Sequence, residues 1–214
     1  MGIGESTDSQ LVVFIAYMMI PLAYLLGALP SGYIIGRISK GIDIREHGSG
    51  KTGMSNVLRL IGKKAAVLVL LIDCSKGALA VFLAQLLVEN PVVLVSVAIA
   101  VLFGHNYSVF IRFHGGAGVL TGVGTLFAFV PLAGIVAAVV GGLVILIFRY
   151  MSLGSMAGTL AAFVTAAYLW AFNDHEATAT IYIAMGASLI FFRHKENIYR
   201  LISGTEPKLA SFSR

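Results

Sequence analysis

The sequence predicts an all-α integral membrane protein with about seven transmembrane helices. Three observations predict it: the composition, the length of the apolar runs, and the distribution of Lys and Arg. Hydrophobic residues make up 58% of the 214 positions and charged residues only 12%, and the mean hydropathy is +0.91. A soluble domain usually has about a quarter of its residues charged. The solvent of this chain must therefore be lipid, which leaves no room for a separate soluble domain.

Apolar runs of membrane-spanning length recur along the chain. A helix needs about 20 apolar residues to cross roughly 30 Å of hydrocarbon, and fewer where the bilayer thins. The run 118–148 is either one long tilted helix or two short ones that turn at Pro131. With two helices, the chain is one membrane domain, 1–214, with spans near 11–36, 65–88, 92–111, 117–130, 132–148, 154–172 and 178–192.

The distribution of charge favours two helices in that run. Lys and Arg concentrate on the cytoplasmic side of a membrane. With seven spans, the segments predicted to face outward contain no Lys or Arg, and fourteen of the fifteen basic residues fall in or beside the opposite segments. We therefore expect the amino terminus outside and the carboxyl terminus in the cytoplasm. The outward segments hold half of the acids, which are Glu5, Asp8, Glu89, Asp174 and Glu176.

Several classes of function are disfavoured. The stretch Gly50-Lys51-Thr52 ends like a P-loop, but that motif needs a glycine where Arg45 stands, so no nucleotide is expected. The net charge of +5 sets orientation and attracts anionic membrane lipids, and with no basic soluble surface we expect no nucleic acid. The carboxylates are scattered, so neither a metal nor another cofactor is predicted. The single cysteine, Cys74, excludes an intrachain disulfide.

Polar residues collect in three segments on the predicted cytoplasmic face: 41–64, 104–122 and 193–204. Because all three lie on one side of the membrane, they can converge on one interfacial site. In the first segment, the glycines leave backbone N–H groups uncovered, and Ser55 and Asn56 are expected to cap the following helix. Arg59 follows at helical spacing, so it should share a face with both. A flexible basic membrane loop remains the alternative.

The other two segments also carry candidate residues. His105 and the glycines at 115, 116 and 118 suggest a close backbone approach to a ligand, although glycines also let membrane helices pack tightly. His194 and Asn197 would share a helical face if the last helix continued past the membrane. Within the second span, Asp73 and Lys76 stand one turn apart, and we expect a structural ion pair that orients the site.

Together these segments resemble the bacterial acyl-phosphate-dependent glycerol-3-phosphate acyltransferases, the PlsY family. The resemblance spans roughly 21–208. "DIREHGSGKTGMSN" is similar to the family pattern D-I-R-x-x-G-S-G-N-x-G-A-T-N, and "GHNYSVFIRFHGGAGVLT" to G-H-x-x-x-x-F-x-x-F-x-G-G-K-G-V-A-T. "RHKENIYRL" fits R-H-x-E-N-I-x-R-L, and the segment 152–155 fits S-L-x-S. The family also has seven spans with the amino terminus outside.

The resemblance implies an activity and a set of site residues. The family transfers a fatty acyl group from acyl phosphate to the 1-hydroxyl of glycerol 3-phosphate, at the cytoplasmic face of the bacterial inner membrane. Glu196 would be structural. By position, the implied catalytic residues are Ser49, Arg59, His194 and Asn197, and the substrate-binding residues are Arg45, Lys51, Ser55, Asn56, His105, Gly115, Gly116, Gly118 and Ser155.

Two departures from the family pattern fall inside the predicted phosphate site. Ala117 stands where the family has lysine, and Lys51 stands where it has asparagine. We hypothesise that Lys51 supplies the charge that Ala117 lacks. Two other functions remain open. A transporter of phosphorylated solutes would share the anion site, although we find no repeat between the halves. A non-catalytic relative would keep the fold without turnover, and Ala117 is the residue that favours it.

Overall fold

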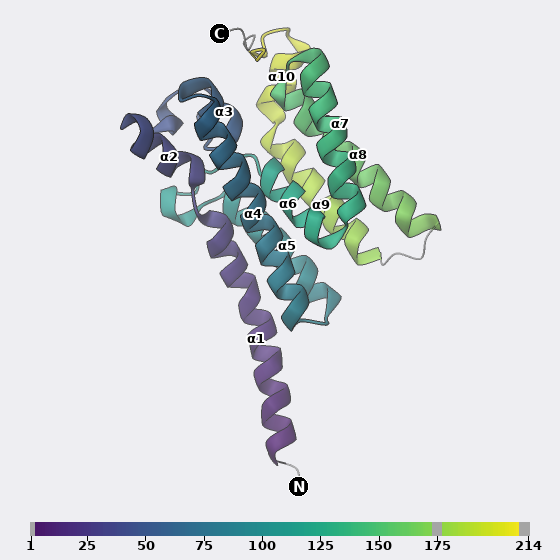
Figure 1. The fold of residues 1–214 in the computed structure, drawn as a ribbon. Helices are drawn as coiled ribbons and strands as arrows, with labels where there is room; N and C mark the ends of the chain where they lie inside the picture. The colour runs from purple at the N-terminus through teal and green to yellow at the C-terminus, as the bar shows by residue number, and fades with distance from the viewer. Residues whose placement is uncertain (1–2, 173–176, 210–214) are drawn as a thin grey trace. The chain divides into compact units, whose positions relative to one another are not determined.

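The computed structural model describes residues 3–172 and 177–209, and the side chains within these ranges except those of 3–9 and 12. All the regular elements it describes are helices (Figure 1). The helices are α1 (Ile3–Ala28), α2 (Ser31–Lys40), η1 (Ile44–Glu46), α3 (Met54–Leu60), α4 (Lys63–Leu87), α5 (Pro91–Asn106), η2 (Val109–Ile111), α6 (Val119–Phe129), α7 (Pro131–Phe148), α8 (Met151–Phe172), α9 (Ala177–Arg193) and α10 (Lys195–Ile202).

The helices confirm an all-α integral membrane protein. Five segments are long and apolar enough to cross a bilayer, and two shorter apolar helices, α6 and α9, accompany them. The run 118–148 is two helices that meet at Val130, as the charge distribution predicted. The count of seven spans and the orientation of the termini stay predictions. The outward acids Asp174 and Glu176, and the side chains of Glu5 and Asp8, lie outside what the structure describes.

The first expected span, 11–36, is not one helix. Helix α1 ends at Ala28, and α2 begins at Ser31 after Pro30. The residue before a proline is pushed out of the helical region, and proline has no backbone N–H to continue the helix. Hydropathy does not register this break, because apolar residues continue through it. Helix α2 ends at Gly41, whose φ of 68° lets its N–H reach the Arg37 carbonyl.

Two compact units, Met1–Phe129 and Val130–Arg214, divide the chain that we predicted as one domain, and each is described by itself. In the first, α1 packs along α5, and α4 packs along α6. Gly77 of α4 lies against the Thr121 carbonyl, and Gly124 of α6 lies against the Cys74 carbonyl. These two glycines face each other's helix with no side chain between, which holds the short α6 firmly against α4.

The second unit is built from α7, α8, α9 and α10. Helix α8 packs on both α7 and α9. Gly141, Gly154 and Gly158 let α7 and α8 approach closely, since a Cβ on any of them would meet the backbone of the facing helix. Helix α9 ends at Arg193, a turn follows at His194, and α10 begins at Lys195. The chain is therefore not one continuous helix through His194, and the condition under which His194 and Asn197 would share a face of one helix is not met.

Candidate active site

The first polar segment folds around Asn56. This side chain is 1% exposed, and its Nδ2 lies 2.9 Å from the Ile44 carbonyl oxygen, 3.1 Å from that of His47 and 3.0 Å from that of Lys51. Its Oδ1 accepts a hydrogen bond of 3.1 Å from the backbone N–H of Ser49. One buried amide therefore shapes the loop, which favours a supporting role for Asn56 over the predicted contact with substrate.

The predicted helix cap is wrong. The residue before α3 is Gly53, so Ser55 and Asn56 lie inside the first turn. Nor do Asn56 and Arg59 share an environment: Asn56 is buried in the loop, whereas Arg59 is exposed. Their three-residue spacing places them near each other along the helix, but the loop wraps over one side only. The partly or fully exposed polar side chains of this segment include Ser49, Lys51, Ser55 and Arg59.

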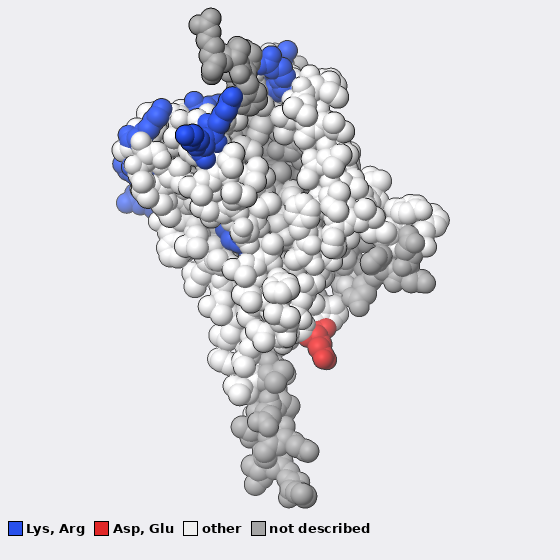
Figure 2. Space-filling model, viewed as in Figure 1, with Lys and Arg blue, Asp and Glu red and all other residues white. Residues whose placement is uncertain are grey.

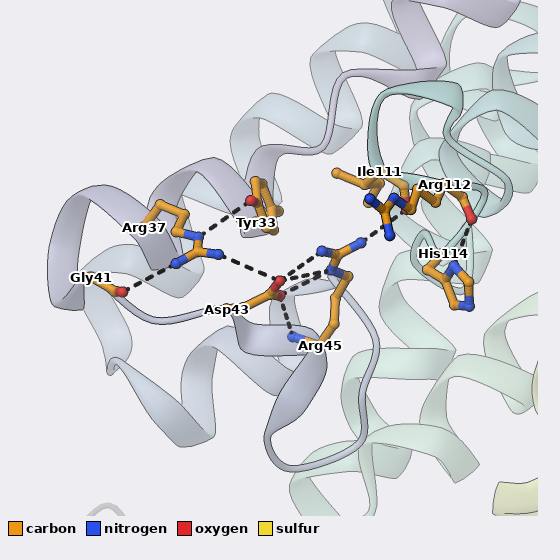
Figure 3. Close-up of polar contacts among 8 residues, drawn as sticks. All are labelled: Tyr33, Arg37, Gly41, Asp43, Arg45, Ile111, Arg112 and His114. Carbon is orange, nitrogen blue, oxygen red and sulfur yellow. Dashed lines mark hydrogen bonds and ion pairs between the residues drawn. The ribbon is translucent and has the colours of Figure 1, made fainter.

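Arg45 is held by the protein itself. Its Nε and Nη2 donate to the Asp43 carboxylate at 2.9 and 2.6 Å, and its Nη1 donates to the Ile111 carbonyl at 2.9 Å. Figure 3 shows Asp43 between the guanidinium groups of Arg37 and Arg45, with Arg45 reaching the second polar segment. The hydrogen bond from Arg45 lowers the pKa of Asp43 to about 2. These contacts favour a supporting role for Arg45 over phosphate binding.

Residues 115–118, which we call the glycine loop, pack against the end of α5. The Gly115 N–H donates to the Asn106 carbonyl at 3.2 Å, and the Gly116 N–H donates to the His105 carbonyl at 3.1 Å. A Cβ on Gly116 would strike the His105 ring, and one on Gly118 would press on the Asn106 amide. Gly118 also has a φ of 83°, which disfavours any other residue.

Two side chains beneath this loop differ in their contacts. His105 is 7% exposed, which favours support of the loop over the predicted direct contact with substrate. Asn106 is fully buried, and within the part of the chain that the structure describes neither polar atom of its amide has a hydrogen-bond partner. Ala117 is the half-exposed residue among the buried glycines at 115, 116 and 118.

The ion pair predicted inside the second span is present. Lys76 Nζ lies 3.0 Å from Asp73 Oδ1, with both side chains almost fully buried. The same oxygen accepts a 2.7 Å hydrogen bond from Ser31 and lies 3.6 Å from His105 Nδ1, while Lys76 also donates to the Leu29 carbonyl. The pair thus joins α4 to the start of α2 and to the histidine beneath the glycine loop.

In the second unit, Glu206 gathers the polar residues. It is 6% exposed. Its carboxylate accepts hydrogen bonds from Ser152 at 2.6 Å, Asn197 at 2.8 Å and Arg200 at 2.7 Å. Burial alone would raise the pKa of Glu206, but these three hydrogen bonds outweigh it and lower the pKa below its usual range. Asn197, a predicted catalytic residue, is therefore held by a carboxylate.

The hydrogen bonds described for Ser155 and His194 go to backbone carbonyls rather than to that carboxylate. Ser155 donates to the Met151 carbonyl of its own helix at 2.8 Å, so Ser152 is the serine of "SLGS" that reaches Glu206. His194 is buried, and its Nδ1 lies 2.8 Å from the Ile190 carbonyl oxygen. A carbonyl oxygen only accepts, so Nδ1 carries the proton. Glu196 is exposed in the first turn of α10.

Sequence reasoning missed five polar residues that organise these sites. Ser31, Ser152 and Glu206 have partners that are distant in sequence, and Asn106 offers the loop its backbone carbonyl, so no local pattern of residue types marks them. Asp43 alone had a local signal, since an acid two residues before an arginine in a basic segment invites pairing. Among the described residues, no group of three or more His, Cys, Asp or Glu could hold a metal ion. The missed residues are Ser31, Asp43, Asn106, Ser152 and Glu206.

Comparison with known proteins shows the family. The family model described as glycerol-3-phosphate acyltransferase matches residues 17–204. A glycerol-3-phosphate acyltransferase of Thermoanaerobacter sp. strain X514 is 40% identical over 188 residues, which cover 88% of this chain and 92% of that protein. One of Thermus thermophilus is 43% identical over 188 residues, with the same coverage of 88% and 92%.

Two solved structures are also similar. The crystal structure of PlsY (YgiH), an integral membrane glycerol 3-phosphate acyltransferase, in its glycerol 3-phosphate form aligns with a TM-score of 0.84 and 35% identity, covering 92% of this chain and 96% of that one. Its lysophosphatidic acid form aligns with a TM-score of 0.81 and 34% identity, with the same coverage. From these matches, the chain belongs to the glycerol-3-phosphate acyltransferase family.

Proposed function

We propose that this protein transfers a fatty acyl group from acyl phosphate to the 1-hydroxyl of glycerol 3-phosphate, giving lysophosphatidate and phosphate for phospholipid synthesis. The observation that carries the proposal is the likeness to PlsY in its glycerol 3-phosphate form, at a TM-score of 0.84 and 35% identity over 92% of the chain. The acceptor follows from the names of these relatives. The acyl-phosphate donor rests on the resemblance of the motifs.

The first unit supplies the groups that we assign to phosphate binding. Gly48 and Gly50 take φ values of 61° and 68°, so the loop turns tightly. The N–H groups of Ser49 and Gly50 donate to Asn56 and to the His47 carbonyl, so the assignment rests on the side chains of this segment rather than on bare backbone N–H groups. We assign Ser49, Lys51, Ser55 and Arg59 to the phosphate groups of the substrates, with Ser49 and Arg59 closest to the reacting phosphate. The glycine loop at 115–118 would receive glycerol 3-phosphate beside Ala117 and Gly118, because the N–H groups of Gly115 and Gly116 already donate to the Asn106 and His105 carbonyls.

The second unit supplies the groups that we assign to proton transfer and orientation. The glycerol hydroxyl oxygen attacks the acyl carbon, the bond from that carbon to the phosphate oxygen breaks, and the phosphate leaves. Acyl phosphate is already activated, so positioning and charge neutralisation supply most of the acceleration. With the proton of His194 on Nδ1, Nε2 of the neutral ring can accept the hydroxyl proton. A substrate phosphate is the other candidate acceptor.

Asn197 and Ser155 complete this assignment. Glu206 fixes the Asn197 amide by a 2.8 Å hydrogen bond, which presets the direction of its carbonyl oxygen. Ser155, half-buried in the first turn of α8, is assigned to substrate contact.

We also propose that the active site faces the cytoplasm from a bacterial inner membrane. In the first unit, Figure 2 shows Lys and Arg gathered over α2 and α3, with a small acidic patch toward the turn between α4 and α5, where Glu89 stands. This separation of charge supports the orientation that the positive-inside rule predicts. Anionic lipid headgroups beside the basic residues would strengthen it by about 1 kcal/mol per residue.

The test is phosphate release by the purified protein in detergent or bilayer, given palmitoyl phosphate and glycerol 3-phosphate. A parallel reaction replaces the donor by palmitoyl-CoA. We expect turnover that needs both substrates, with lysophosphatidate formed and the CoA ester inert. Turnover with palmitoyl-CoA but not with palmitoyl phosphate would contradict the proposal that acyl phosphate is the donor. Binding of glycerol 3-phosphate without turnover from either donor would favour the non-catalytic relative, for which Ala117 is the specific observation. Uptake by proteoliposomes without turnover would favour the transporter.

A further inference from the structure

We propose that Asp43 and Arg45 are positioning residues for the acyl transfer, and that together they hold the glycine loop in place from a distance. We call these two residues the clasp. The inference rests on the proposed function and extends it, because Arg45 was expected to bind substrate itself and Asp43 had no assigned role.

The two residues of the clasp are hydrogen-bonded to each other within the first polar segment. Asp43 is 6% exposed. It accepts the backbone N–H of Arg45 at 3.0 Å and the side-chain Nε and Nη2 of the same residue at 2.9 and 2.6 Å. Paired guanidinium and carboxylate groups in this forked geometry hold a defined orientation. The guanidinium also lies over the ring of Tyr33, 4.9 Å from its centroid, which anchors it to α2 (Figure 3).

From this fixed position Arg45 reaches across 66 residues to the second polar segment. Its Nη1 donates to the Ile111 carbonyl at 2.9 Å. Ile111 is buried and lies only four residues before the glycine loop. The clasp therefore sets the position of the backbone from which that loop departs.

The backbone between Ile111 and the loop needs such restraint. Arg112 and Phe113 both have positive φ values, 56° and 62°, in a region that residues with a Cβ enter at a cost. Backbone of this kind persists where its surroundings over-determine it. The restraints here include the hydrogen bond from Phe113 N–H to the Ser108 carbonyl and that from Arg45 to the Ile111 carbonyl. Without the clasp, one of these restraints is lost.

The hydrogen-bond partners of the Arg45 guanidinium favour a positioning role for this residue over direct binding of phosphate. Three of the five N–H groups of Arg45, one on each guanidinium nitrogen, already donate to Asp43 or Ile111. A lysine at this position would keep the charge, but its single ammonium could not bridge a carboxylate and a carbonyl in the same way. The variant Arg45→Lys therefore separates a positioning role from a role that needs only the positive charge.

The experiment compares Asp43→Asn, Arg45→Lys, the double variant, and the matched control Arg37→Lys. Arg37 also lies near Asp43, at 3.7 Å, but it is half-exposed, and its other described hydrogen bonds stay within α2 and its cap. With palmitoyl phosphate as donor, we expect each clasp variant to raise KM for glycerol 3-phosphate about tenfold, while kcat falls less than about threefold. The double variant should stay within about twofold of the worse single variant, since the residues act as one unit. Arg37→Lys should match the parent.

A second measurement tests the effect of the clasp on the backbone without depending on catalytic activity. Hydrogen exchange of the backbone at 108–118, in detergent, should speed up in both clasp variants and stay unchanged in Arg37→Lys. If the parent protein shows no acyltransferase activity but the exchange pattern is as expected, the proposed function is rejected, while the structural role of the clasp is supported. The clasp itself is overturned by unchanged exchange in both variants. It is also overturned if Arg45→Lys keeps parental KM, or if Asp43→Asn lowers KM by releasing Arg45 to bind phosphate.

Discussion

Two buried carboxylates, one in each unit, organise the polar segments in different ways. Asp43 and Glu206 are each 6% exposed. Asp43 faces two guanidinium groups, and its main partner, Arg45, goes on to a backbone carbonyl. Glu206 faces one guanidinium, from Arg200, together with a hydroxyl and an amide. The first carboxylate thus controls the path of the chain, and the second controls the direction of side chains.

Under the proposed function, this difference predicts that the two units affect different kinetic constants. A shifted loop weakens the grip on a substrate, which appears mainly in KM. A rotated side chain at the reacting atoms weakens the transition state, which appears mainly in kcat. We therefore expect variants of the first unit to act through KM and variants of the second unit to act through kcat.

The largest expected effect belongs to the second unit, at His194. His194→Gln should lower kcat by about 100-fold or more, the usual range for loss of a general base, with glycerol 3-phosphate binding intact. If His194 is the base, the parent should show a bell-shaped pH profile of the rate, and this profile should vanish in His194→Gln. Tyr199→Phe, at a side chain of α10 that is 74% exposed, serves as the control and should match the parent. A His194→Gln protein that keeps kcat and its pH profile would assign the proton to a substrate phosphate.

Glu206→Gln should give the next largest effect. The neutral amide keeps one acceptor oxygen but leaves Arg200 without its ion pair and gives Asn197 a poorer acceptor. We expect kcat to fall about tenfold, with KM for glycerol 3-phosphate within about twofold of the parent. Ser152→Ala removes a single hydrogen bond to the same carboxylate and should cost less. If Glu206→Gln changed only KM, the expected distinction between kcat effects in the second unit and KM effects in the first would be wrong.

The two carboxylates should also make the folded state sensitive to acid. The folded-state pKa of Asp43 is lowered to about 2 from an ordinary 3.8. A lowered pKa stabilises the folded state in full above about pH 4, and that stabilisation is lost as the pH falls toward 2. For Asp43 it amounts to about 2 kcal/mol. Thermal unfolding in detergent between pH 6 and pH 2 should show the loss in the parent and a smaller one in Asp43→Asn.

Glu206 adds to this loss in the same direction, since its pKa is also lowered. Its contribution is present in full above its ordinary pKa of 4.5 and is lost as the pH falls from there through the lowered folded-state pKa. An equal acid dependence in the parent, Asp43→Asn and Glu206→Gln would contradict both assignments.

The smallest expected effect tests the exchange of charge in the first unit. Lys51→Asn should raise KM for glycerol 3-phosphate about threefold, because one exposed cation near a phosphate contributes modestly. Adding Ala117→Lys, which restores the usual family pair, should return KM to the parental value. Unchanged activity in Lys51→Asn would show that Lys51 does not replace the missing lysine.

Much of the fold was predictable because hydropathy and charge are local properties. The division of the run 118–148 at Val130 followed from Pro131 and from the placement of Lys and Arg. The pair of Asp73 and Lys76 followed from helical spacing inside an apolar run. The break before Ser31 was missed, because apolar residues continue on both sides of Pro30 and hydropathy outweighed the proline.

The candidate site was less predictable, because its contacts join distant parts of the chain. Ser152 meets Glu206 across 54 positions, and Arg45 meets Ile111 across 66. The acceptor at Ile111 is a backbone oxygen, which every residue carries, so no residue type marks it. Asn56 was predicted to cap a helix, but its amide finds three backbone carbonyls in the preceding loop instead.

The ion pair of α4 bears on how this protein is made. An isolated charge at the centre of a helix costs about 3 kcal/mol to insert into a bilayer, and α4 carries two. Because Asp73 and Lys76 stand one turn apart on the same helix, they pair as soon as the helix forms. Helix α4 can therefore leave the translocation channel with an electrically neutral centre, before α5 has been synthesised, and its ion pair receives His105 when that helix arrives.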